Sequence, residues 1–190
     1  MRYIIEHMEP KLFRWCIIEY KHISKAVGKN NLIFTNIKRS DTKKLSDYGK
    51  VFNKSISSVQ SGLKIENACL LDQSAKDELS PDDCKKFKCL IFGGILGDFP
   101  RKKRTKKLSE MVRCEKRNLG KKQFSTDNAV LVAKLIKEGK TLKTIPFQEK
   151  IEISLKKGES VIFPFRYVLI KGKPFISAEL IRYLQKKKGF

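Results

Sequence analysis

Residues 89–98 read CLIFGGILGD, an apolar run that passes directly into three glycines and an aspartate. A short apolar run bounded by glycines is typical of a buried strand in a parallel sheet. The stretch lacks both the Gly-x-Gly-x-x-Gly dinucleotide pattern and a Gly-Lys-Ser/Thr phosphate loop. Its glycines would let the backbone approach a flat apolar group such as adenine, although a tight turn at the strand end is the simpler explanation.

Similar apolar runs precede this stretch and alternate with helical patterns. Strands are predicted over Tyr3–Ile5, Leu32–Thr35, Ala68–Leu71 and Cys89–Phe92. Apolar residues at helical spacing follow Pro10 and stop at Gly28, and Ser80 is placed to cap a helix that opens at Pro81. Strands that alternate with amphipathic helices predict an α/β fold with a mainly parallel sheet flanked by helices.

The remaining patterns complete a single domain over residues 1–190. The predicted elements are helices around Lys44–Phe52, at Thr105–Val112, from Ser125 or Thr126 to Glu138 and after Ser177, and strands at Lys150–Leu155 and Val161–Leu169. Gly139 ends the third of these helices. We find no internal repeat and no linker long enough to divide the chain into two domains.

The composition excludes several classes of protein. The chain has 190 residues, of which 42 are Lys or Arg and 20 are Asp or Glu, and 41% of its residues are apolar, enough to bury a core. No apolar run approaches the roughly 20 residues that span a bilayer, so no membrane partner is expected. Five cysteines without paired spacing and two histidines predict no metal site, and reduced thiols favour a cytosolic or nuclear chain, of which we expect the cytoplasmic one.

The net charge of +22 is densest in one band of the sequence. Residues 101–122 hold 11 basic and 2 acidic residues. Such clustering is the electrostatic footprint of nucleic-acid binders, and it indicates a possible contact with rRNA or the ribosome. A solvated face in a lysine-rich chain explains the band equally well.

Carboxylates follow two of the predicted strands. Glu6 and Asp98 each come after apolar or glycine-rich chain, where a carboxylate is costly unless it has a partner. Asp127 lies just inside a predicted helix, where its first role is to complement the helix dipole. His7 could act as a general base, but the sequence shows no recognisable Ser or Cys nucleophile with a supporting acid. Hydrolytic catalysis is therefore disfavoured.

Four stretches of the chain carry a resemblance to a known family. They are IIEHME (4–9), FGGILGD (92–98) followed by RTK (104–106), LGKKQFSTD (119–127) and PFRYV (164–168). In this order they resemble the small eukaryotic and archaeal SPOUT methyltransferases, most closely the fungal protein-arginine methyltransferases that act on small-subunit ribosomal protein three. The resemblance implies a trefoil knot, formed by about residues 68–140 with the C-terminal strands and helix, and S-adenosylmethionine (SAM) bound within it.

The resemblance also implies which loops hold SAM and, after transfer, its product S-adenosylhomocysteine (SAH). The implied cofactor contacts are Leu71, Asp72, Gly93, Gly94, Ile95, Leu96, Gly97, Leu119, Gly120, Gln123, Phe124, Ser125 and Thr126. One departure is Gln73, where the fungal relatives carry a proline.

Methyl transfer to arginine requires a carboxylate, because a guanidinium has no free lone pair at neutral pH and has to be oriented and polarised. The catalytic candidates are Glu6 and Asp98, with Asp127 third. The candidate substrate contacts are His7, Glu9 and Arg166.

Three functions stay open on the sequence. The first is methyl transfer to an arginine of a ribosomal protein, and the second is methyl transfer to rRNA or tRNA, which the net charge favours. The third is an assembly factor that retains the cofactor without turnover. Acidic residues around the acceptor site would favour the first, and Lys121 and Lys122 beside a cofactor loop favour the second. A monomer is expected, with a homodimer as the alternative.

Overall fold

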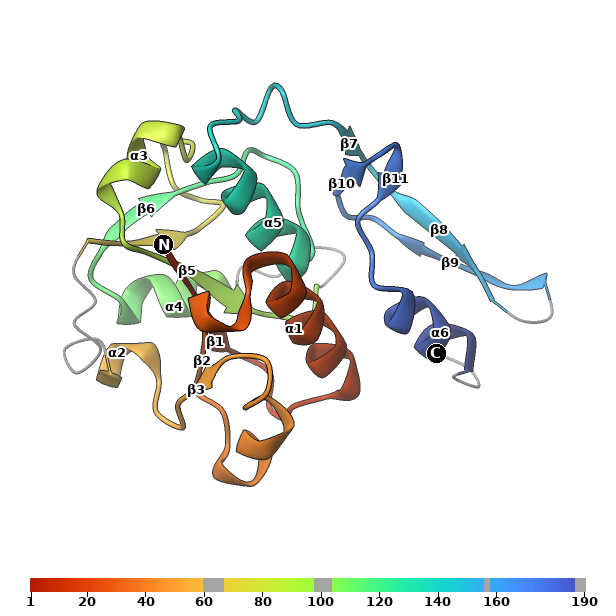
Figure 1. Cartoon of the computed structure of the whole chain (residues 1–190), viewed down its shortest axis with the longest axis horizontal. Coiled ribbons are helices and arrows are strands. Elements are labelled where there is room, and N and C mark those ends of the chain that lie inside the picture. Colours follow the sequence, from red (N-terminus) through yellow and green to blue (C-terminus); the bar gives the residue numbers. More distant parts are fainter. Residues whose placement is uncertain (60–66, 98–103, 156–157, 187–190) are drawn as a thin grey trace.

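The computed structural model describes residues 1–59, 67–97, 104–155 and 158–186. Its centre is a six-stranded sheet in the order β3-β2-β1-β5-β4-β6, and all of its strand pairs are parallel (Figure 1). The strands are β1 (Arg2–His7), β2 (Leu32–Thr35), β3 (Lys50–Val51), β4 (Ala68–Leu71), β5 (Cys89–Gly94) and β6 (Glu115–Arg117). The predicted parallel sheet is therefore confirmed.

Helices cover both faces of this sheet. They are α1 (Arg14–Val27), α2 (Ile56–Val59), α3 (Pro81–Lys86), α4 (Thr105–Met111) and α5 (Thr126–Lys137), with 3-10 turns at η1 (Lys29–Asn31) and η2 (Arg39–Lys44). Alternate residues of β1 point to opposite faces, as the pleat requires. Tyr3 and Ile5 pack in the cluster that holds α1 and α5, whereas Ile4 packs with Leu108 of α4. The result is three layers, with a helix layer on each side of the sheet.

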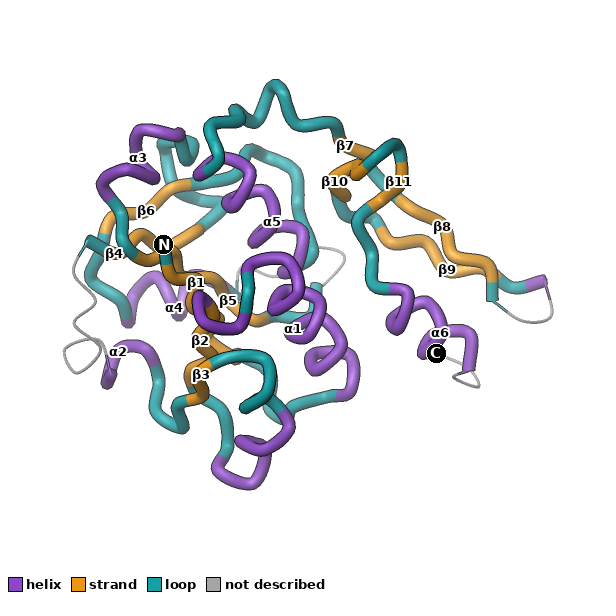
Figure 2. The backbone as a smooth tube through the Cα atoms, viewed as in Figure 1, coloured by secondary structure: helices purple, strands orange, loops and turns teal. Residues whose placement is uncertain are grey.

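The C-terminal lobe, which we define as residues 147–186, lies to one side of the sheet (Figure 2). It contains β7 (Phe147–Gln148), β8 (Ile151–Ser154), β9 (Ser160–Phe163), β10 (Tyr167–Ile170), β11 (Lys173–Pro174) and α6 (Ala178–Lys186). Its strands form a three-stranded and a two-stranded antiparallel sheet. The lobe packs on α1, where Ile18 joins its core and Lys21 forms an ion pair with Glu179 at 2.9 Å.

Local signals in the sequence fix several element ends. Ser80 and Asp83 form the two reciprocal hydrogen bonds of a capping box at the start of α3, with Pro81 in its first turn. Gly139 adopts a φ of 96° just past α5, a conformation that glycine tolerates at a helix end. The helix after Ser177 also forms as predicted, since the Ile181 amide donates to the Ser177 carbonyl.

Three of the predicted elements differ in the structure. The first helix begins at Arg14 instead of Pro10, because the preceding residues form a loop that carries Glu9 across to the end of β5. The predicted helix at Lys44–Phe52 is wrong, since that stretch holds the end of a 3-10 turn and the edge strand β3. The predicted strand Val161–Leu169 is two strands, because Pro164 has no N–H to continue a ladder. The knot and the single domain stay predictions.

Candidate active site

The carboxyl ends of the parallel strands open into a pocket, as expected for a sheet of this kind. We call it the cofactor pocket. It is lined by Leu71, Asp72, Gln73, Phe92, Gly93, Ile95, Gly97, Thr105, Leu119, Gly120, Lys122, Gln123, Phe124, Thr126 and Ala129. These residues come from the ends of β4 and β5, from the loops after β4, β5 and β6, and from the starts of α4 and α5. Three loops that are far apart in the sequence therefore meet at one edge of the sheet.

Ten of the thirteen residues predicted to contact the cofactor line this pocket. The three that do not are Gly94, Leu96 and Ser125. Gly94 faces α1 instead, since a Cβ there would lie 2.2 Å from the Tyr20 hydroxyl. Five lining residues were not predicted, namely Gln73, Phe92, Thr105, Lys122 and Ala129. Individual contacts to the cofactor stay predictions, but the pocket they require is present.

The chemistry of the pocket suits the adenosine part of SAM. Leu71, Phe92, Ile95 and Leu119 give it apolar wall surface that fits a flat base, and Asp72 supplies a buried carboxylate. Oδ1 of Asp72 accepts hydrogen bonds from the Ser74 amide at 2.9 Å and hydroxyl at 2.8 Å. No described residue donates to Oδ2, so that oxygen can accept from a hydroxyl or ammonium group. Gln73 donates to the Lys121 carbonyl at 2.5 Å and so ties two of the loops together.

Glu9 holds the loop after β5 in place. Its Oε1 accepts from the Leu96 amide at 2.7 Å and from Nη1 of Arg104 at 2.8 Å. Arg104 also donates to the Leu96 carbonyl. Both the amide and the carbonyl of Leu96 are therefore held by this pair of side chains. Glu9 was predicted to contact substrate, and Arg104 was counted in the basic band. The geometry instead makes the pair a clamp on the cofactor loop.

A second pocket adjoins the first, and we call it the acidic pocket. It is lined by Trp15, Glu19, Leu96, Gly97, Ser125, Asp127, Val161, Ile162, Phe163, Pro164, Phe165, Tyr167, Ile176 and Leu180. Gly97 lines both pockets. Ser125 lines the acidic pocket, and the next residue, Thr126, lines the cofactor pocket. The wall comes from α1, the loop after β5, the start of α5 with the residue before it, and the C-terminal lobe. Two carboxylates thus stand among aromatic side chains directly beside the cofactor pocket.

Asp127 is anchored by four hydrogen bonds. Its Oδ1 accepts from the Ser125 hydroxyl at 2.6 Å and from the amide and side chain of Asn128 at 2.8 and 3.2 Å. Its Oδ2 lies 2.8 Å from Nδ1 of His22, whose ring stacks on Phe175. Asp127 was the third catalytic candidate, and the structure brings it to the pocket. His22 was not predicted, because its position in α1 gives no local signal of a partner 105 residues away.

Glu19 is the second carboxylate of the acidic pocket. It is 6% exposed, and no described residue forms a hydrogen bond with it. Burial raises the pKa of Glu19 well above its ordinary value, and the charges of Asp127 and Glu9 raise it further. The sequence did not single out Glu19, because a glutamate in an amphipathic helix is typical of a solvent-facing position. Its burial depends on the lobe, which lies far along the chain.

Glu6 lies outside both pockets. Its carboxylate accepts hydrogen bonds from the Thr35 hydroxyl, from the Ser55 hydroxyl at 2.6 Å and from the Ile56 amide at 2.9 Å. These bonds join β1 to β2 and to the start of α2. The catalytic role predicted for Glu6 stays a prediction, and this placement does not support it. Asp98, the other leading candidate, lies outside the described residues.

The last two candidate substrate contacts, His7 and Arg166, line neither of the two pockets. His7 is buried with Nδ1 at 2.8 Å from the Tyr20 hydroxyl, and this burial lowers the pKa of His7. Arg166 forms two hydrogen bonds with Glu149 and stacks over Phe147, 4.6 Å from the ring centroid. Its backbone amide donates to the Gln123 carbonyl, so Arg166 supports a cofactor loop from outside.

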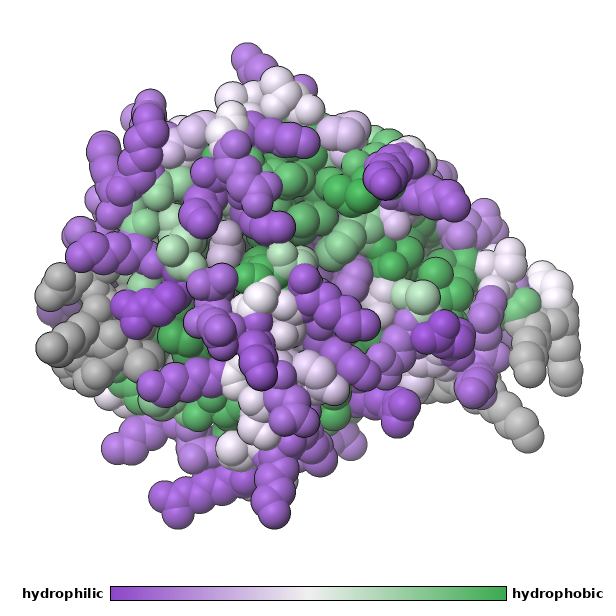
Figure 3. All heavy atoms as spheres, viewed as in Figure 1, coloured by the Kyte–Doolittle hydropathy of each residue, from purple (hydrophilic) through white to green (hydrophobic). Residues whose placement is uncertain are grey.

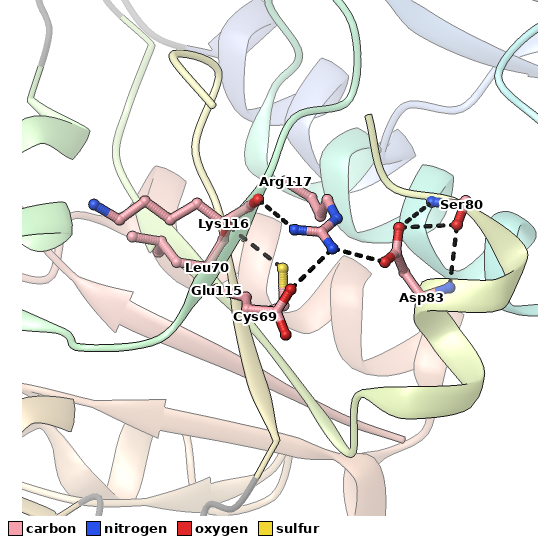
Figure 4. A network of polar contacts seen from close by, with 7 residues as sticks. All are labelled: Cys69, Leu70, Ser80, Asp83, Glu115, Lys116 and Arg117. Carbon is pink, nitrogen blue, oxygen red and sulfur yellow. Dashed lines mark hydrogen bonds and ion pairs between the residues drawn. The ribbon is translucent and has the colours of Figure 1, made fainter. Parts of the chain in front are cut away.

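A second cation of the basic band is also engaged inside the protein (Figure 4). Arg117 donates to Asp83 and to Glu115, both at 2.9 Å, and it stacks over Phe87. These two carboxylates raise the pKa of Arg117 further above its ordinary value, since they stabilise its charged form. The exposed cations of the band within the described residues are Lys106, Lys107, Arg113, Lys116, Lys121 and Lys122.

Two further searches concern the described residues. None of their helices is long and apolar enough to cross a membrane. Within the same residues, no group of three or more His, Cys, Asp or Glu side chains is arranged to hold a metal ion.

Comparison with known proteins identifies the family. The profile of the family described as "Protein arginine N-methyltransferase SFM1-like" matches residues 2–189. This chain belongs to that family. It is 37% identical over 203 residues to protein arginine N-methyltransferase SFM1 of Saccharomyces cerevisiae, an alignment that covers 98% of this chain and 95% of the yeast protein. The family predicted from the four sequence stretches is therefore confirmed.

Solved structures extend the family likeness to three dimensions. The yeast SFM1 complex with SAM superposes with a TM-score of 0.88 at 36% identity, covering 97% of this chain and 90% of that one. The SAH complex gives 0.87 at 35% identity, covering 96% and 94%. Trm10 from Thermococcus kodakaraensis gives 0.57 at 19% identity over 75% of this chain and 95% of that chain, which shows a shared fold alone. The family's cofactor matches the one predicted here, and the SPOUT fold is confirmed.

Proposed function

We propose that this chain transfers a methyl group from SAM to the guanidinium of an arginine in a small-subunit ribosomal protein. The observation that carries the proposal is the acidic pocket, which meets the cofactor pocket at Gly97. A guanidinium is a permanent cation, and it binds best where carboxylates and aromatic faces replace its water. Glu19 and Asp127 supply the negative charge, and Trp15 and Tyr167 stand among the aromatic walls.

The two pockets would bind the two reactants separately. SAM supplies an electrophilic methyl group, and the cofactor pocket would hold it through apolar walls, loop backbone and Asp72. The acidic pocket would hold the arginine so that one of its nitrogens faces Gly97, where the two pockets meet. Fixing two reactants in this way contributes much of the rate, because the reaction becomes effectively unimolecular.

The charge distribution argues against an RNA acceptor. An acceptor site for RNA needs cations for phosphate groups, yet no Lys or Arg is among the described residues that line the acidic pocket. This absence is notable in a chain with a net charge of +22. Lys122 is the one basic side chain in the described wall of the cofactor pocket, and it is directed toward Glu149 at 3.9 Å.

The basic exterior suits a docking role. Hydrophilic side chains cover much of the face shown in Figure 3. We propose that the exposed cations of the band contact rRNA on the ribosome or its precursor, while the acidic pocket receives the arginine. The working location would then be the cytoplasm, and the enzyme would act as a monomer. A mass of twice 22.0 kDa by light scattering would contradict the monomer.

The test is methyl transfer from tritiated SAM to ribosomal extract, followed by protease or ribonuclease. We expect protease to release the label, ribonuclease to leave it, and mass spectrometry to place it on an arginine of a small-subunit protein. Asp127→Asn should remove most of the label, whereas Glu138→Gln, which neutralises an exposed carboxylate at the end of α5, should retain it. Label released by ribonuclease would show an RNA substrate instead.

A further inference from the structure

Two carboxylates face one acceptor pocket, and their surroundings are opposite. Asp127 is held by four hydrogen bonds, including one from His22. Glu19 receives none from the described residues and is as deeply buried. Pairs of titratable groups whose environments differ in this way commonly divide an acid–base task between them.

We infer that Glu19 accepts the proton that the arginine guanidinium releases, and that His22 holds Asp127 in place as the anchor of the same guanidinium. The inference rests on the proposed function. A proton has to leave, because guanidinium and sulfonium are both cations before transfer and only the methylguanidinium is one afterwards. The arginine nitrogen bonds to the methyl carbon, the carbon–sulfur bond breaks with its electron pair remaining on sulfur, and one N–H proton passes to Glu19.

The placement of Glu19 and His22 supports this division. They are three residues apart in α1, so they lie on the same side of that helix, which packs against α5. Asp127 reaches both from the start of α5, since it bonds to His22 and its charge acts on Glu19. The His22 ring is fixed by stacking on Phe175 at 4.0 Å between centroids. A carboxylate acceptor on Nδ1 sets the tautomer with the proton on that nitrogen.

Other titratable groups around Glu19 come from several elements. Asp127 lies on α5, Tyr167 on β10, Glu9 in the loop before α1, and Cys16 on α1 itself. Burial raises the pKa of Tyr167 above its ordinary value and that of Cys16 to about 12, so both stay protonated at neutral pH. Tyr167 and Cys16 therefore do not contribute to the acid–base behaviour of the pocket near neutrality.

The first test is Glu19→Gln, which keeps the shape and removes the proton acceptor. We expect kcat to fall roughly 100-fold or more, the range for losing a general base, with SAH affinity unchanged by calorimetry. Wild-type kcat should rise with pH as Glu19 ionises in the enzyme–substrate complex, and this limb should be absent in the variant. Should the variant not fold, a wild-type kcat that stays flat between about pH 5 and pH 9 would overturn the assignment.

The second test separates the two contacts of His22. His22→Phe keeps a ring to stack on Phe175 without a donor, whereas His22→Asn keeps a donor for Asp127 without the ring. We expect His22→Phe to raise the KM for an arginine peptide roughly tenfold, and His22→Asn to stay within about threefold of wild type. If His22→Asn raises the KM more than His22→Phe does, His22 acts through its packing on Phe175 and not through its bond to Asp127.

The matched control is Glu138→Gln, for which both kinetic parameters should equal those of wild type. Failure of the proposed function is distinguishable from failure of the inference. If wild type labels no arginine, the proposed function is wrong. If wild type labels arginine and Glu19→Gln does so at the same rate, only the assignment of Glu19 is wrong.

Discussion

The two adjoining pockets are built in different ways. The cofactor pocket is made of loops that follow β4, β5 and β6, so contiguous stretches of sequence supply most of its wall. Most of the acidic pocket is made of side chains from α1, the start of α5 and the C-terminal lobe, with Leu96 and Gly97 of the loop after β5 beside them. Its two carboxylates, Glu19 and Asp127, are more than 100 residues apart in the chain.

The difference explains which pocket a sequence reveals. A loop that holds a ligand with its backbone needs glycines and apolar neighbours, and these form a motif. A pocket that binds through side chains on packed helices needs single residues whose neighbours look ordinary. The comparison can therefore be tested by substitutions that affect one pocket at a time and by a substitution at Gly97, which both pockets share.

The largest expected effect concerns Glu6, which belongs to neither pocket. Glu6→Gln removes the charge on which three hydrogen bonds converge and places an amide NH₂ where one of the two oxygens accepted, and each donor left without an acceptor costs roughly 1–3 kcal/mol. We expect the free energy of unfolding to fall by about 3 kcal/mol, measured by urea denaturation, with turnover per folded molecule nearly unchanged.

The control for Glu6 is Asp82→Asn, the same chemical change at an ion-paired carboxylate that is 80% exposed. It should cost less than about 0.5 kcal/mol. Lost turnover in Glu6→Gln without lost stability would contradict the structural role and restore Glu6 as a catalytic carboxylate.

The next effect concerns the wall that the pockets share. A Cβ added at Gly97 would lie 2.3 Å from Cζ of Phe165, so Gly97→Ala has to displace that ring. We expect a cost of about 1–3 kcal/mol in stability, typical of overpacking, and weaker binding of both SAH and peptide. Calorimetry with each ligand measures the two effects separately. Loss of binding for one ligand alone would show that Gly97 does not serve both pockets.

Much of the fold could be predicted because its signals are local. The runs at β2, β4 and β5 are buried on both faces, so they are apolar throughout and stand out. The capping box at Ser80 and the glycine after α5 mark helix ends within a few residues. The cofactor pocket follows from these strands, since ligands bind at the carboxyl ends of parallel strands.

The rest depended on contacts between distant segments. Glu9 and Arg104 meet at the end of β5, and neither the delayed start of α1 nor the inward turn of that arginine has a local cause. Glu19 is a candidate catalytic residue only because it is buried in a pocket that the C-terminal lobe helps to form. Patterns of three or four residues carry no information about such burial, which explains why Glu19 was missed, whereas Asp127, at a predicted helix start, and most of the cofactor pocket were not.

A moderate effect concerns the stability of the acidic pocket. The fold raises the pKa of Glu19 above its ordinary 4.5, so the native state binds more protons than the unfolded chain once pH exceeds that value. Stability contributed by protonated Glu19 is therefore lost as pH rises through the raised pKa. Glu19→Gln should remove this slope and exceed wild type in stability near pH 8 by about 1.4 kcal/mol per unit of pKa shift. Thermal unfolding of both proteins across this pH range measures the difference. If the stability of wild type and of Glu19→Gln changes with pH in the same way, the prediction is wrong.

The smallest effect concerns Arg166, which supports the cofactor pocket from outside. Arg166→Lys keeps the charge but loses the planar stacking on Phe147 and the double contact with Glu149. Because that glutamate is half exposed, we expect a loss of less than about 1 kcal/mol and a two- to threefold weaker affinity for SAH. The sequence predicted a substrate contact for Arg166 instead. If the KM for peptide rises while SAH affinity holds, that prediction is correct, and the boundary between the two pockets lies farther out along the lobe than Gly97.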